Sequence, residues 1–288
     1  MIPAQFDYLV PKTLDEAVRL LGEHTDDAKV LAGGHSLIPA MKLRLAAPQI
    51  LIDIGRIKDL SYIREEGDQI RIGAMTTYYE IESSERLREI CPLLPETAAQ
   101  IGDVQVRNKG TIGGSLAHSD PAADLPAAII ALGAEVVAVG ANGERVIKAD
   151  DFFVDLMTTA LDAGEILREV RIPVPEQGSG QAYLKMPQPA SGFAVVGIAV
   201  TLTRDQGGVC QSAGVGVTGV ASKAYRATGA EKALVGSTLD EQAINTAAAA
   251  IAAGVSINGD LFASDEYRKH LAEVYARRAI QAAASRAK

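Results

Sequence analysis

Cysteine is scarce in this sequence, because only Cys91 and Cys210 occur among 288 residues. Iron–sulfur clusters and structural zinc sites usually take several ligands from closely spaced cysteine pairs. These two cysteines lie far apart, so we expect neither kind of site and no metal site in the chain. Isolated cysteines are most often small buried side chains, and we assign them no chemistry.

Basic clusters and long apolar runs are also lacking. The formal net charge is -8, whereas a protein that binds nucleic acid or an anionic membrane needs a basic face. No apolar run approaches the length of about 18 residues that a membrane-spanning helix needs, and residues 1–7 lack the basic and apolar regions of a signal peptide. We therefore expect a soluble acidic protein of the cytoplasm.

Several catalytic and nucleotide-binding motifs are missing. There is no GxGxxG fingerprint and no GxxxxGK[ST], so a Rossmann NAD site and a P-loop have no local support. There is also no Ser–His–Asp arrangement, no HExxH and no recognisable pair of carboxylates. We expect no catalytic acid, base or nucleophile in this chain.

The first part of the chain predicts a small α/β lobe over residues 1–56. Thr13 is a suitable N-cap for a helix with an apolar stripe at Ala17, Leu20 and Leu21. Short β-prone runs follow at residues 28–32 and 50–54. From about residue 57 the pattern changes, and a second lobe is expected to continue to residue 176.

The second lobe and the remainder show alternating β-prone and helical segments. Strands are expected at residues 69–73 and 134–139, and helices at 83–90 and around 93–101, before a loop at 106–110. Residues 172–180 are rich in Pro and Gly, which places a domain boundary near 176. Residues 177–288 predict an antiparallel sheet backed by helices, with strands at 194–202 and 214–220 and helices at 243–253 and 264–284.

Two paired-glycine loops stand out. Gly33 and Gly34 follow a predicted strand, and Gly113 and Gly114 lie in the second lobe between hydroxyl side chains. Adjacent glycines let a backbone approach a ligand closely and turn its N–H groups toward an anion. Each pair alone is also common in ordinary turns. Two such loops in different lobes favour one shared ligand, a dinucleotide whose diphosphate lies between the lobes.

The residues around these loops resemble the FAD-binding subunits of molybdenum hydroxylases, the carbon monoxide dehydrogenase and xanthine dehydrogenase family. The first motif is KVLAGGHSL at residues 29–37, followed by MKLR at 41–44. The second is VRNKGTIGGSLAHSDPAADLP at residues 106–126. EIL at 165–167 and YLK at 183–185 follow in family order, so that the resemblance spans nearly the whole chain.

The resemblance implies an α+β fold with a two-lobed FAD-binding domain of the vanillyl-alcohol oxidase/p-cresol methylhydroxylase type, followed by a C-terminal α+β domain. The FAD contacts that it implies come from Val30, Leu31, Ala32, Gly33, Gly34, His35, Ser36, Leu37, Ile101, Thr111, Ile112, Gly113, Gly114, Ser115, Asp124, Leu167 and Lys185. The two loops would wrap the diphosphate, and Asp124 would accept a hydrogen bond from the adenosine ribose. Ile101 stands where xanthine oxidase has an aromatic residue against the flavin, and Phe193 is a candidate replacement.

Some of these residues also have simpler interpretations. Asp124 precedes Leu125 and Pro126 and by local sequence is equally suited to cap a helix, and most lysines, Lys185 included, are surface residues. The resemblance favours function for both. We expect a ligand contact from His35 and none from His118, and we take His24 and His270 as surface residues.

The resemblance implies that substrate is hydroxylated at a molybdenum cofactor in a large partner subunit and that electrons pass through [2Fe-2S] clusters in a small one. This chain would pass them through FAD to an external acceptor, with quinone or cytochrome favoured over NAD. The implied assembly is a dimer of heterotrimers. Two alternatives stay open from sequence, namely a self-contained FAD oxidoreductase and a non-enzymatic FAD-binding assembly factor. Carbon monoxide, aldehydes and N-heterocycles are all open as substrates.

Overall fold

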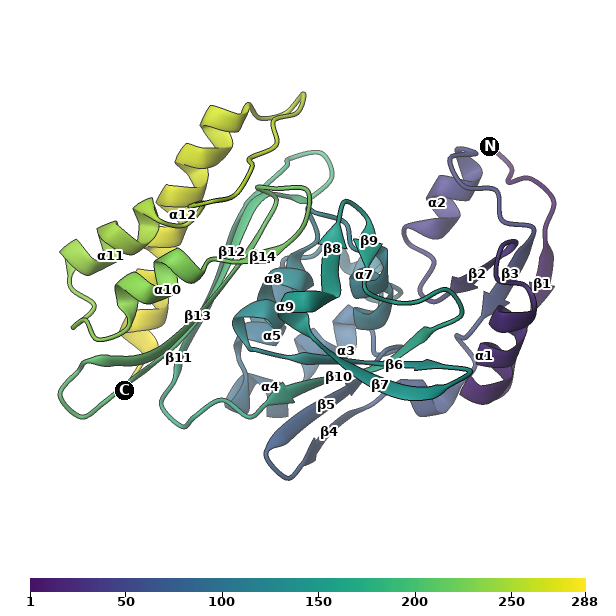
Figure 1. Ribbon diagram of the computed structural model, residues 1–288, viewed down its shortest axis with the longest axis horizontal. Helices are drawn as coiled ribbons and strands as arrows, with labels where there is room; N and C mark the ends of the chain where they lie inside the picture. The colour runs from purple at the N-terminus through teal and green to yellow at the C-terminus, as the bar shows by residue number, and fades with distance from the viewer.

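The computed structural model describes residues 1–288 and contains three main β-sheets arranged along the long axis of the molecule (Figure 1). The N-terminal lobe lies at one end, the second lobe in the middle and the C-terminal part at the other end. The N-terminal lobe contains β1 (Asp7–Leu9), α1 (Leu14–Glu23), β2 (Ala28–Leu31), α2 (Leu37–Lys42) and β3 (Ile50–Asp53).

A parallel three-stranded sheet in the order β1-β3-β2 forms the N-terminal lobe. Thr13 caps α1, because its side chain accepts a hydrogen bond from Glu16 N. The helix buries Ala17, Val18 and Leu21 in a cluster of nine residues that includes Ile52 of the central strand. The apolar stripe thus fixes the helix against the sheet, and β2 ends where the first glycine loop begins.

An antiparallel five-stranded sheet in the order β4-β5-β10-β6-β7 forms the second lobe. Its strands are β4 (Ile63–Glu66), β5 (Gln69–Gly73), β6 (Glu135–Gly140), β7 (Gly143–Lys148) and β10 (Ile166–Pro173). The connections contain η1 (Lys58–Leu60), α3 (Tyr78–Ser83), α4 (Glu85–Ile90), α5 (Leu93–Ala99), α6 (Val104–Arg107), α7 (Ile112–His118), α8 (Asp124–Ala131), α9 (Ala149–Phe152) and the paired strands β8 (Phe153–Asp155) and β9 (Thr158–Thr159).

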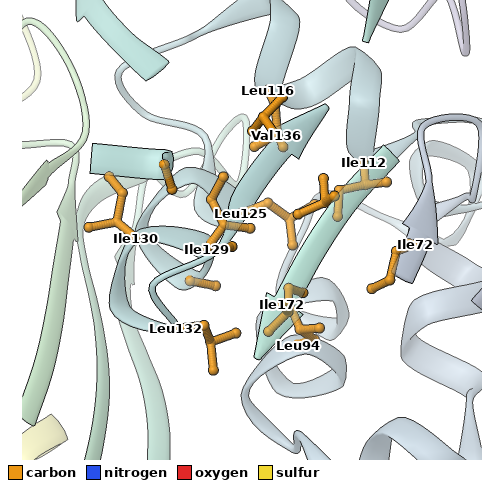
Figure 2. Close-up of a cluster of buried hydrophobic side chains, with 14 of the residues drawn as sticks. Ile72, Leu94, Ile112, Leu116, Leu125, Ile129, Ile130, Leu132, Val136 and Ile172 are labelled. Carbon is orange, nitrogen blue, oxygen red and sulfur yellow. The ribbon is translucent and has the colours of Figure 1, made fainter. Parts of the chain in front are cut away.

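The helices of the second lobe pack on its sheet around a core of 32 buried residues. Figure 2 shows Ile72 and Ile172 from the sheet together with Ile112, Leu116 and Leu125 from the helices. All of these side chains are fully buried. Burial of this apolar surface is the main stabilisation of α7, which carries the second glycine pair.

The C-terminal part contains an antiparallel sheet in the order β11-β12-β13-β14 with helices on one face (Figure 1). Its elements are β11 (Gly180–Pro187), β12 (Ala194–Arg204), β13 (Cys210–Thr218), β14 (Tyr225–Arg226), α10 (Thr228–Leu234), α11 (Glu241–Ala249) and α12 (Asp265–Arg286). Ser264 caps α12 by accepting from Tyr267 N, and the helix buries Ala276, Ala279 and Ala283. These small side chains let the long helix lie close to the sheet.

Helix α8 lies on the other face of this sheet and joins it to the second lobe. All eight of its residues are buried. A Cβ atom added at Gly216 of β13 would stand 1.9 Å from the carbonyl oxygen of Ala127, and one at Gly214 would stand 2.0 Å from that of Ala131. The helix backbone therefore rests directly on a glycine strip of β13, which only residues without a side chain allow.

The sequence predicted most of these elements within a few residues and missed others. The strand expected at 214–220 begins earlier, at Cys210, and the helix expected at 83–90 is divided by Ser84, which caps α4. The expected loop at 106–110 overlaps the short helix α6. The Pro- and Gly-rich run at 172–180 is partly strand, since β10 continues through Pro173.

Cys91 and Cys210 are both buried, in the cores of the second lobe and the C-terminal part respectively. Burial raises the pKa of the Cys91 thiol to about 12. Both residues therefore lie in the cores as small side chains, as expected. Among the helices, none combines the length and the apolar character needed to cross a membrane.

Candidate functional site

The first glycine loop leaves β2 after Leu31 and leads into α2. Gly34 has a φ of +74°, a left-handed conformation that a residue with a side chain rarely adopts. Its carbonyl accepts a hydrogen bond from Ile38 N and so begins the turn into α2. Ala32, Gly33 and Gly34 are only partly buried, and the next two residues, His35 and Ser36, are exposed.

The backbone N–H groups of this loop have no partners within the protein. None of the five consecutive N–H groups of Gly33, Gly34, His35, Ser36 and Leu37 donates to a backbone or side-chain acceptor. Backbone N–H groups left free around a left-handed glycine form a concave site with a positive potential. The loop is therefore built to receive an anion with several oxygen atoms.

The second glycine loop differs, because its N–H groups are already used. Ile112 N donates to Thr76 O at 3.0 Å and Gly113 N to Ala74 O at 2.9 Å. Gly114 N and Ser115 N donate to the side chain and the carbonyl of Thr111, which caps α7. The sequence-based expectation that this loop presents N–H groups in the same way as the first is therefore wrong: these groups hold α7 to the second lobe.

The two loops nevertheless meet. A Cβ atom added at Gly33 would stand 2.0 Å from the carbonyl oxygen of Lys109, and one at Gly114 would stand 3.6 Å from the Cβ of Ala32. Gly113 packs with similar closeness on Ala74. The glycines thus let the two lobes approach each other at this point, with Ala32 at the start of the first loop beside Gly114 of the second.

A buried polar cluster lies at the junction with the C-terminal part. Lys185 Nζ is 2.9 Å from Asp124 Oδ1, with the two side chains 3% and 5% exposed, and Tyr183 donates its hydroxyl hydrogen to the same carboxylate. Lys185 Nζ also donates to the carbonyls of Gln100 at 2.6 Å and Gly192 at 2.8 Å. All three ammonium hydrogens therefore have acceptors, and the cluster joins α8, β11 and two loops.

The environment of this cluster governs its ionisation. Burial raises the pKa of the Asp124 carboxyl, while the Lys185 ammonium and the Tyr183 hydroxyl oppose that rise. Burial, together with the neighbouring carboxylate, raises the pKa of the Tyr183 phenol well above its ordinary value. Because the carboxylate is paired and hydrogen-bonded, its charge is compensated within the protein.

The structure overturns both simpler interpretations of these residues. Ala123 is the N-cap of α8, so Asp124 is not a helix cap but the first residue of the helix. Lys185 is buried, not a surface lysine. Sequence analysis did not single out Tyr183 as a site residue. Tyr183 and Lys185 are two residues apart in β11, so both side chains point to the same face of the sheet and reach Asp124 of α8.

The remaining expected site residues are more scattered. Ile101 is partly buried against the core of the second lobe, and its carbonyl accepts from Arg107 Nη1 at 3.1 Å. Leu167 is 4% exposed and belongs to the same core. Phe193 is 46% exposed and follows Gly192, beside Gly102. The loop before α6 and the loop before β12 thus lie next to each other.

Arg107 was not singled out as a site residue, yet it fixes the approach to the second loop. Its guanidinium pairs with Glu82 at 2.7 Å and donates to the carbonyls of Ile101 and Gly102. The side chain is 16% exposed. The sequence gives no sign that this arginine is buried and paired with Glu82. Its only signal in the sequence is its place within the long second motif.

Comparison with known proteins covers both parts of the chain. A family model described as the FAD binding domain in molybdopterin dehydrogenase matches residues 4–175, and one described as the CO dehydrogenase flavoprotein C-terminal domain matches residues 181–283. The carbon monoxide dehydrogenase medium chain of Afipia carboxidovorans is 44% identical over 288 residues, with 100% of both chains covered.

Two further matches also span the whole of this chain. The 6-hydroxypseudooxynicotine dehydrogenase complex subunit alpha of Paenarthrobacter nicotinovorans is 38% identical over 288 residues, which cover 100% of this chain and 97% of that protein. A chain in the crystal structure of the Cu,Mo-CO dehydrogenase, in its cyanide-inactivated form, superposes with a TM-score of 0.97 at 44% identity, with 100% of both chains covered.

Proposed function

Because the chain belongs to the family of FAD-binding medium subunits of carbon monoxide dehydrogenase-like molybdenum hydroxylases, we propose that it is the electron exit of such a complex. In this proposal the molybdenum cofactor belongs to a large partner subunit and [2Fe-2S] clusters to a small one. The chain takes electrons from those clusters and passes them to an external acceptor, a quinone or cytochrome in preference to NAD.

The observation that carries the FAD-binding part of this proposal is the row of five unpaired N–H groups at Gly33–Leu37. The diphosphate of FAD bears negative charge on several oxygens, and the loop offers N–H donors without a competing protein acceptor. The close contact of Gly33 with the carbonyl of Lys109 places this loop directly against the second lobe. The residues present therefore fit the diphosphate of a dinucleotide held between the lobes.

FAD, when bound, supplies electron transfer between a donor and an acceptor, and the protein supplies binding and orientation. We propose that Ala32–Leu37 hold the diphosphate and that the partly exposed Gly114 and Ser115 contact it from the second lobe. Thr111 acts through α7, which it caps. The contact between Asp124 and the adenosine ribose, which the family resemblance implies, stays a prediction. It requires the carboxylate to accept a hydrogen bond from the ribose in addition to those from Tyr183 and Lys185.

We further propose that the FAD-binding domain ends near residue 176, with lobes at about 1–56 and 57–176, and that residues 177–288 form the C-terminal domain. Three core clusters support this division in the main, although Tyr183, Ala199 and Ala224 of the C-terminal part pack in the core of the second lobe. A dimer of heterotrimers is the proposed assembly. The cytoplasmic location expected from the sequence stays a prediction.

The proposed electron exit can be tested on the complex purified with its partner chains. The complex is reduced anaerobically with dithionite and then mixed with a soluble quinone, a cytochrome or NAD⁺ while the flavin absorbance is followed. Rapid reoxidation by quinone or cytochrome and not by NAD⁺ is expected. Reoxidation by NAD⁺ alone contradicts the acceptor assignment, and substrate turnover by the isolated chain contradicts its role as a subunit without a substrate site.

A further inference from the structure

The imidazole of His35 binds back to its own loop. His35 Nδ1 lies 3.0 Å from the carbonyl oxygen of Gly33. A carbonyl oxygen accepts only, so Nδ1 must carry the hydrogen in this contact. The side chain makes no other hydrogen bond and no ion pair, and the residue is exposed. Its single hydrogen bond therefore goes to the peptide between the two glycines.

The orientation of this peptide decides whether it offers an anion an N–H group or a carbonyl oxygen. In a planar trans peptide the C=O and the following N–H point in opposite directions. The carbonyl of Gly33, turned toward the imidazole, therefore leaves the N–H of Gly34 turned away from it, and that N–H has no partner in the protein. Rotation of the peptide by half a turn would exchange the two and present an oxygen atom instead.

Nothing in the covalent structure of Gly33 and Gly34 opposes such a rotation, because neither has a Cβ atom. Glycine populates positive and negative φ about equally, and Gly34 has a φ of +74°. Gly33 cannot gain a side chain, since its Cβ would meet the Lys109 carbonyl at 2.0 Å. The close contact between the lobes thus requires a glycine pair, and the glycine pair leaves its shared peptide weakly fixed.

We propose that His35 is a positioning residue: its Nδ1–H holds the Gly33 carbonyl so that the N–H of Gly34 stays available to the diphosphate of the dinucleotide. This proposal rests on the FAD site proposed above and assigns His35 an action through the loop, without contact to the flavin ring. It predicts which nitrogen of the side chain matters. It also predicts that the effect reaches any ligand with the same diphosphate.

The test compares three substitutions in the deflavinated complex, titrated with FAD and with ADP. H35N places an amide N–H about where Nδ1 lies, H35Q moves that donor one bond farther from the backbone, and H35L removes it. Losing the hydrogen bond should weaken binding about five- to tenfold. We expect H35L and H35Q to lose this much affinity for both ligands, and H35N to stay within about threefold of the unchanged protein.

Three outcomes contradict the proposal. Retained affinity in H35L means that the glycine peptide needs no anchor, and rescue by H35Q in place of H35N means that Nε2, not Nδ1, is the group that acts. A loss for FAD without a loss for ADP assigns His35 to the flavin end. Because His35 is exposed, the melting temperature of every variant should stay unchanged. Failure of the unchanged complex to bind FAD would instead reject the proposed function itself.

Discussion

Gly33 is a residue at which the backbones of the two lobes touch closely, and its importance is steric. The carbonyl oxygen of Lys109 occupies the place where a side chain would begin. Sequence analysis singled out this glycine for its freedom of backbone conformation, but the decisive property is its lack of a Cβ atom. The sequence alone could not show this steric requirement, because it depends on where the Lys109 backbone of the second lobe lies.

We predict that Gly33→Ala separates the lobes and lowers the free energy of unfolding by about 2 kcal/mol, as expected when a methyl group is forced into a filled space. FAD affinity should fall with it. Gly22→Ala is the matched control, because no atom lies within 4 Å of its added Cβ and the residue is in α1. That control should be neutral or slightly stabilising. Equal urea midpoints for the two variants would contradict the steric account.

The buried pair of Asp124 and Lys185 gives a prediction that depends on pH. Removing one partner of a buried ion pair leaves the other charge uncompensated, so Lys185→Met should lower the free energy of unfolding near neutral pH by about 3–5 kcal/mol. The exposed Lys269→Met changes the net charge equally and should have almost no effect. Urea unfolding of both variants measures the difference.

The sign of the pH effect follows from the raised pKa of Asp124. Without the ammonium, that pKa rises further above its value of about 3.9 in the unfolded chain. Between these two values the folded state binds more protons than the unfolded state, so that the free energy of unfolding falls as the pH rises. Lys185→Met should therefore be less damaging at about pH 5 than at about pH 7.5. A larger loss at the lower pH would contradict this assignment.

At the scale of elements, α7 and α8 illustrate what a sequence pattern leaves open. Both glycine pairs were visible in the sequence, and both loops do come together. The N–H groups of the second loop, however, are consumed by Thr76, Ala74 and Thr111. Which donors stay free depends on strand ends that lie far away in the chain, and no local pattern reports this.

Helix α8 gives the prediction at this scale. Gly216→Ala would bring a Cβ to within 1.9 Å of the Ala127 carbonyl and push the helix off the C-terminal sheet. We expect a loss of about 2–3 kcal/mol in the free energy of unfolding. Hydrogen exchange should show faster exchange in α8 and β13 than elsewhere. Unchanged exchange there, with Gly22→Ala as the reference, would show that the helix does not depend on this contact.

At the scale of the whole molecule, the sequence predicted the order of lobes and the antiparallel C-terminal sheet. The sequence predicted fewer of the features that depend on contacts between distant parts of the chain. β1 was missed because three residues, Asp7–Leu9, are too few to show alternation. The roles of Arg107 and Tyr183 became clear only from their burial and their hydrogen-bond partners. The contacts of Asp124 with Tyr183 and Lys185 join residues about 60 positions apart, and no local pattern links them.

The proposed function requires this chain to hold FAD between its lobes within a molybdenum hydroxylase complex. Its direct test is the flavin content of the complex purified with its partner chains, identified by extraction and mass determination. We expect one FAD per copy of this chain, and its loss in Gly33→Ala at unchanged association with the partners. A correctly assembled complex without flavin would refute the proposed function.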